Sequence, residues 1–107
     1  MDTLFDISIS EDNKMTYQDK FEELVSEYID QETISVLRIQ KEKKVGFKLA
    51  YQVYKEWHHY HDEVFWHNAI YEISFMEEPP TPSRIMNEFD ISYYFAKELF
   101  DYYMEII

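Results

Sequence analysis

The sequence predicts a mainly α-helical protein, and three observations support this fold class. Apolar residues make up 46% of the 107 residues and aromatic residues 19%, which supplies enough apolar surface to fold the chain despite a formal charge of -12. One Gly and three Pro leave few tight turns, which disfavours a many-stranded β-sandwich. Apolar residues recur at spacings of three and four in several segments, as they do along one face of a helix.

The first half of the chain predicts a short strand followed by three helices. Residues 3–9 alternate between apolar and polar side chains, which indicates a weak edge strand. Helical spacing then predicts a helix over residues 17–30, a short one over 34–43 and a third from 47 to about 57. The only glycine, Gly46, separates the last two, and we expect a sharp turn there.

Residues 63–75 fit either a buried helix or two strands that turn at Asn68 and Ala69. We favour a β-hairpin because β-branched and aromatic residues dominate, and because residues 71–75 alternate strictly. The prolines at 79–82 then predict a stiff linker, since neither a helix nor a central strand continues through them. The expected organisation is a winged-helix-like unit over residues 1–78, the linker, and a second helix pair over 83–107 packed on the first unit.

The two halves of the chain contain a weak internal repeat. Shifting the sequence by 46 residues aligns 35–57 with 81–103 and pairs identical residues at four positions: Arg38 with Arg84, Ile39 with Ile85, Glu42 with Glu88, and Ala50 with Ala96. Each copy predicts a short helix, a tight turn and a longer helix, which is the form of a helix-turn-helix. The alternative is that two unrelated amphipathic helix pairs share this pattern.

The first copy and the helix before it resemble a known DNA-binding family over about residues 17–57. The turn residues Val45, Gly46 and Phe47, together with Gln40, Lys41 and Ala50, match the C-terminal gamma domain of the FtsK and SpoIIIE DNA translocases. The chain departs from that family's pattern at Glu42, Lys43 and Leu49, where the family has Arg, Phe and Arg. The resemblance implies a winged helix-turn-helix, with the hairpin at 63–75 as its small β-wing, that contacts duplex DNA.

The charges are strongly segregated along the chain. Residues 36–57 carry six cations against two acids, a net charge of +4, whereas the other residues carry four cations against twenty acids, or -16. In a helix-turn-helix, the turn and the start of the second helix meet the phosphates of DNA. The candidate nucleic-acid-binding residues are therefore Arg38, Lys41, Lys43, Lys44 and Lys48. The alternative role of these lysines is to keep an exposed turn in water.

The acidic remainder supports a different function. Acid-rich small proteins can present carboxylates in place of phosphates, so the alternative is an acidic DNA mimic that occupies the DNA-binding groove of a host enzyme. The acids of this chain are spread singly along the expected helices, as they would also be on ordinary exposed faces. Spacing alone does not separate the two functions.

Two further groups of side chains are candidate sites. Four histidines lie close together in the sequence, and a metal site there is the alternative to a role at a helix end: His58, His59, His61 and His67. Aromatic residues surround the last helix more fully than a one-sided core requires, so we expect it to contact a partner protein or a second copy of the chain. The candidate contact residues are Tyr94, Phe95, Phe100, Tyr102 and Tyr103.

The sequence predicts a binding protein and no enzyme. It contains no Cys, no Gly-rich phosphate loop and no catalytic signature, and we expect no cofactor or metal. It contains neither a signal-peptide pattern nor an apolar run long enough to cross a membrane, so we expect a cytoplasmic protein. The expected function is that of a small accessory factor that contacts DNA weakly. Its protein partner would be a larger replication, partition or translocation enzyme, for example of a phage or other mobile genetic element.

Overall fold

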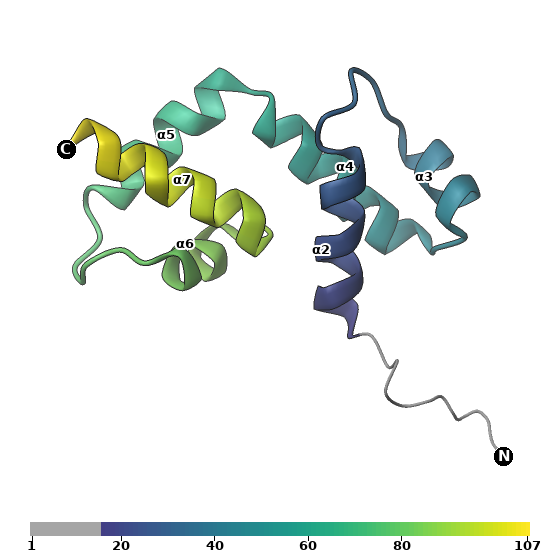
Figure 1. Cartoon of the computed structure of the whole chain (residues 1–107), viewed down its shortest axis with the longest axis horizontal. Helices are drawn as coiled ribbons and strands as arrows, with labels where there is room; N and C mark the ends of the chain where they lie inside the picture. The colour runs from purple at the N-terminus through teal and green to yellow at the C-terminus, as the bar shows by residue number, and fades with distance from the viewer. Residues whose placement is uncertain (1–15) are drawn as a thin grey trace, which may run out of the picture.

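The computed structural model describes residues 16–107, which form six helices (Figure 1). These are α2 (Tyr17–Tyr28), α3 (Val36–Lys43), α4 (Phe47–Tyr60), α5 (Glu63–Ile73), α6 (Pro82–Phe89) and α7 (Tyr93–Ile106). The expectation of a mainly helical fold is confirmed, while the strand expected over residues 3–9 lies outside the described residues.

A polar side chain caps the start of most of these helices. Thr16, Ser35, Thr81 and Ser92 each accept a hydrogen bond from the backbone N–H three residues later, at 3.0 to 3.2 Å. Asp62 caps α5 in the same manner by accepting from the N–H of Val64 at 3.0 Å. These caps satisfy backbone donors that a helix leaves unpaired in its first turn, and they fix where each helix begins.

The first three helices enclose one hydrophobic core. The apolar residues of α2 that recur at spacings of three and four are buried together with Ile39 of α3 and Ala50 and Val53 of α4. Trp57 of α4 ties the loop after α2 to this core, because its indole N–H donates to the carbonyl oxygen of Gln31 at 2.8 Å. Helices α2, α3 and α4 therefore pack as one three-helix unit.

The last three helices enclose a second core. It is formed by Ala69 and Ile73 of α5, Ile85 of α6, and apolar residues of α7. The proline-containing segment 79–82 therefore lies within this unit and connects two of its helices. Pro82 itself occupies the first turn of α6, where a backbone N–H would have no acceptor within the helix, so the missing N–H of proline costs no hydrogen bond.

The predicted β-hairpin over residues 63–75 is wrong, because residues 63–73 form the helix α5. A helix places Ala69 and Ile73 one turn apart on a single buried face. The alternating pattern that suggested a strand would have buried Tyr71 and Phe75 together with Ile73, yet these two rings are 67% and 69% exposed. The packing of α5 on α7 thus outweighs the β-propensity of its residues. Residues 16–107 contain no strand that could form the wing of a winged helix.

The two units repeat the same architecture with a constant offset of 46 residues. Helices α3 and α6 have the same length, as do α4 and α7, and all four boundaries are shifted by 46. The residue that ends the first helix of each pair has left-handed backbone geometry, with φ 54° at Lys44 and φ 56° at Asp90. The offset also relates the first residues of α2 and α5. Each unit is therefore one helix followed by a helix-turn-helix.

Figure 1 shows α4 and α5 connecting the two units, with α2 and α3 beside α4 and with α6 and α7 beside α5. Besides the connection between α4 and α5, the two units are in contact at the N-terminus of α7. Glu56 of α4 accepts hydrogen bonds from the backbone N–H of Ser92, at 2.7 Å, and from its hydroxyl. Glu22 of α2 accepts from the N–H of Tyr93 at 2.6 Å. Two glutamate side chains of the first unit thus satisfy backbone donors at the start of a helix of the second.

Candidate nucleic-acid interface on α4

The second helix of the first helix-turn-helix, α4, has one face that the fold leaves uncovered. Its opposite side is buried through Ala50, Val53 and Glu56. We call the uncovered side the α4 open face, and its exposed residues are Phe47, Lys48, Tyr51, Lys55 and His58. At about 100° per residue these five side chains fall within one third of the helix circumference.

Two aromatic rings and two lysines alternate on the α4 open face. The rings of Phe47 and Tyr51 are stacked, with centroids 5.7 Å apart and planes inclined by 11°. They are 62% and 44% exposed, so both rings are accessible to a ligand from solvent. The ammonium group of Lys48 lies 5.6 Å from the centroid of the Tyr17 ring, a cation–π contact that orients it beside α2.

The structure divides the five predicted cations into two groups. Arg38 forms an ion pair with Glu42 at 3.0 Å, and Lys43 forms one with Glu27 of α2. The Glu27 carboxylate accordingly raises the pKa of the half-buried Lys43 ammonium above its usual value. The charge of Arg38 is therefore paired within α3, and the charge of Lys43 is paired between α3 and α2.

Lys41, Lys44 and Lys48 form the other group. None of the ion pairs found within residues 16–107 includes these three exposed lysines or Lys55. Lys55 was not among the predicted residues, although its position eight residues after Phe47 and four after Tyr51 places it on the same side of a helix. The charges of these four lysines, one at the end of α3, one in the turn and two on α4, are therefore exposed to solvent.

The predicted sharp turn lies next to Gly46, but the residue with left-handed geometry is Lys44. Gly46 has an ordinary extended conformation, with φ -74°, and it precedes the first residue of α4. A Cβ atom at Gly46 would meet no atom within 4 Å. Neither backbone strain nor crowding therefore requires a glycine at this position. Glycine supplies no side-chain acceptor, so no side chain caps the first turn of α4.

The aromatic residues predicted to contact a partner through α7 occupy different environments. Phe95 is completely buried in the second core, so its assignment to a contact surface is wrong. Phe100 and Tyr103 are half-buried against the same core, while Tyr94 and Tyr102 are exposed. The spacing of the aromatic residues did not show that a second core, formed by α5 and α6, would surround this helix.

The four histidines do not converge on a common point. His61 donates from Nε2 to the carbonyl oxygen of Ile29 at 2.7 Å, and His59 stacks on Phe65 with ring centroids 4.2 Å apart. Burial lowers the pKa of His59, and the charge of Lys55 lowers it further. Within residues 16–107, no three metal-ligating side chains come together as a site.

Comparison with protein-family models, with curated proteins and with solved structures finds no match for this chain. In the part of the chain that the structure describes, no helix combines the length and the apolar character needed to cross a bilayer.

Proposed function

We propose that this protein is a small non-enzymatic accessory factor that contacts nucleic acid weakly through the α4 open face and binds a partner protein through its second unit. The observation that carries the proposal is the alternation of stacked, exposed rings with lysines on the second helix of a helix-turn-helix. That helix is the one that enters the major groove in proteins of this architecture. Exposed aromatic rings with neighbouring cations also suit the stacking of unpaired bases.

The charge distribution supports weak rather than tight binding. Four lysines, Lys41, Lys44, Lys48 and Lys55, are available to phosphates, which predicts a log-log salt slope of roughly -3.6 for duplex DNA at about -0.9 per contact. The net charge of the chain is nevertheless -12, and that field repels a polyanion. We therefore expect affinity to be measurable at low salt and to be supplemented by a protein partner.

The proposal is tested by fluorescence anisotropy with labelled single-stranded and duplex oligonucleotides at about 50 mM salt. Lys44→Glu combined with Lys48→Glu should abolish binding. Phe47→Ala combined with Tyr51→Ala should weaken it roughly tenfold, because a stacked base contributes about 1–3 kcal/mol.

A matched control is Lys97→Glu, which reverses an exposed cation on α7 at the position that corresponds to Tyr51. We expect this variant to bind as the wild type does. An absence of binding by the wild type at low salt, or an equal loss in the control, would refute nucleic-acid contact through α4.

One observation favours the acidic-mimic alternative. Four carboxylates and a single cation line a hollow of about 320 Å³ in the second unit: Glu72, Glu77, Glu78, Glu88 and Arg84. Arg84 pairs with Glu78 at 2.5 Å, which leaves three carboxylates in excess. Under this alternative the protein binds no nucleic acid and instead displaces a labelled duplex from a basic DNA-binding protein. Glu77→Gln combined with Glu88→Gln should then remove the displacement.

A further inference from the structure

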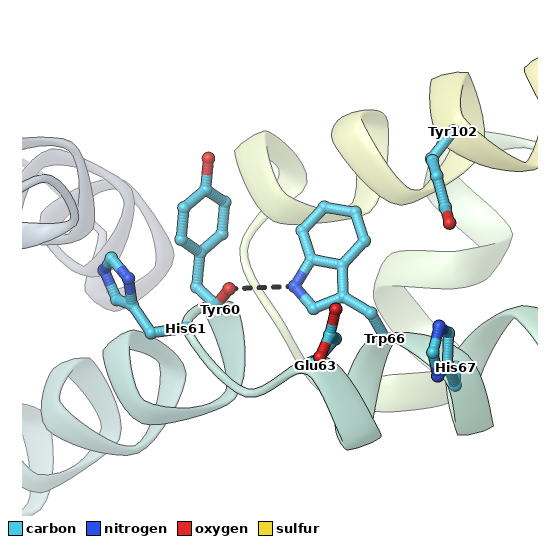
Figure 2. Close-up of a pocket in the computed structure, with 6 residues that line it drawn as sticks. All are labelled: Tyr60, His61, Glu63, Trp66, His67 and Tyr102. Carbon is cyan, nitrogen blue, oxygen red and sulfur yellow. Dashed lines mark hydrogen bonds between the residues drawn. The ribbon is translucent and has the colours of Figure 1, made fainter.

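A pocket of about 370 Å³ opens where α4, α5 and α7 meet (Figure 2). Its walls are Tyr60 and His61 at the end of α4, Glu63, Trp66 and His67 of α5, and Tyr102 of α7. This volume lies near the lower end of the range for small-molecule sites, which suits a single side chain or a small organic group. The pocket faces away from the α4 open face, because Tyr60 follows Tyr51 by nine residues, or about half a turn of rotation.

Three aromatic rings form the rigid part of the pocket. The Trp66 ring lies edge-to-face with Tyr60, at 5.8 Å between centroids, and with Tyr102, at 5.7 Å. The indole N–H of Trp66 donates to the carbonyl oxygen of Tyr60 at 2.8 Å, as the dashed line in Figure 2 shows. The Tyr60 hydroxyl donates to Glu98 at 2.9 Å. The polar atoms of Trp66 and Tyr60 are therefore satisfied within the chain, which fixes the orientation of both rings.

Glu63 adds a carboxylate to these aromatic walls. It is exposed, and it takes part in none of the side-chain hydrogen bonds or ion pairs found within residues 16–107. The second unit, residues 63–107, carries nine acids against two cations, a net charge of -7. Both the local and the wider field at the pocket therefore attract a cation.

We propose that this pocket binds an arginine side chain of a basic partner peptide. A guanidinium plane can stack on the Trp66 ring while its forked N–H donors bind the Glu63 carboxylate in a bidentate manner. An ammonium group lacks both the plane and the fork, so lysine fits less well. The inference rests on the partner-binding half of the proposed function and assigns the class of partner.

The inference is tested by titrating the full chain, labelled with ¹⁵N, with a short capped peptide that contains one arginine. The Trp66 indole N–H signal should shift with saturable, millimolar affinity. The same peptide with citrulline, which keeps the shape and loses the charge, should bind at least about tenfold more weakly. A lysine peptide should lie between the two.

Two variants locate the site, and each has a matched control. Glu63→Gln and Tyr102→Leu should each weaken the arginine peptide roughly fivefold. Glu72→Gln and Tyr71→Leu change an exposed carboxylate and an exposed tyrosine outside the pocket, and they should leave the affinity unchanged.

Equal binding of the citrulline peptide, a lysine peptide that binds as tightly as arginine, or unchanged affinity in both pocket variants would overturn the inference. Nucleic-acid contact is measured on the opposite side of α4 with a different ligand. A failed peptide titration alongside intact oligonucleotide binding would therefore reject the arginine site alone.

Discussion

The buried carboxylate of Glu56 makes the stability of this protein depend on pH in a direction that can be tested. Glu56 is 3% exposed and lies between the two units. Burial raises its pKa from 4.5 to about 7, and the hydrogen bonds from Ser92 act against this rise. The nearby charges of Glu22 and Asp90 raise the pKa further.

The sign and size of the effect follow from linkage. The folded protein holds a proton on Glu56 more tightly than the unfolded chain, so the contribution to stability is complete below about pH 4.5 and is lost as the pH rises through about 7. The difference between the two pKa values corresponds to about 3 kcal/mol. Between about pH 5.5 and about pH 7.5 the free energy of unfolding should fall by about 2 kcal/mol from this group alone.

Urea unfolding of the wild type and of Glu56→Gln, followed by circular dichroism at both pH values, measures this contribution. Glutamine keeps the shape of the neutral carboxylic acid, with one carbonyl acceptor and one donor group, but does not titrate. Relative to the wild type, the variant should therefore gain about 2 kcal/mol between the lower and the higher pH. His59 has a lowered pKa and makes stability rise with pH, the opposite trend. Its contribution is present in both proteins and therefore cancels in the difference between them.

Glu105→Gln, which neutralises an exposed carboxylate, should show no such pH-dependent difference from the wild type. The reasoning is refuted if Glu56→Gln differs from the wild type by the same amount at both pH values, or if it is the less stable protein near pH 7.5. Either result would mean that the amides at the start of α7 hold Glu56 as an anion despite its burial.

Three further substitutions test the local structure. Gly46→Ser should raise the free energy of unfolding by a few tenths of a kcal/mol, measured by thermal unfolding, because it supplies the missing cap of α4 without steric conflict. Ile39→Ala and Ile85→Ala should each cost about 2–5 kcal/mol in urea unfolding, since they occupy equivalent positions in the two cores, whereas exposed Leu37→Ala should cost little. Lys44→Gly should raise stability by up to about 1 kcal/mol by removing left-handed strain, and should at the same time weaken oligonucleotide binding in the anisotropy assay.

The sequence was sufficient to predict elements whose pattern is local. Helices α2, α4 and α7 have apolar residues at spacings of three and four, and α2 and α7 also have a capping residue in front of them. A β-hairpin was favoured over the helix α5 because the exposed rings of Tyr71 and of Phe75, which follows the helix, look the same in sequence as the buried residue Ile73. Only the packing of α5 on α7 decides which of these side chains leave water.

Prediction of the candidate sites was limited in the same way, because contacts between distant segments do not show in a local sequence pattern. Sequence could identify Lys43 as a cation of the predicted turn, but not that Glu27, sixteen residues earlier, would pair with it. The pocket next to Trp66 was also missed, since its walls come from three helices and Tyr102 is 36 residues away in the chain. The exposure of large side chains such as Phe47 and Tyr51 on α4 could have been inferred, because this helix has more large apolar residues than one buried face can hold.

The two copies of the helix-turn-helix differ at the positions that decide what their turns can contact. In the second copy, Ser92 caps α7, and the carboxylates of Glu22 and Glu56 occupy the start of that helix. Its turn is therefore used to join the units. In the first copy, Gly46 leaves the start of α4 without a side-chain cap, and exposed lysines stand where the second copy has Asp90 and Tyr94. If one copy meets an external polyanion, it is the first, because acceptors from within the chain already occupy the backbone N–H donors at the start of α7.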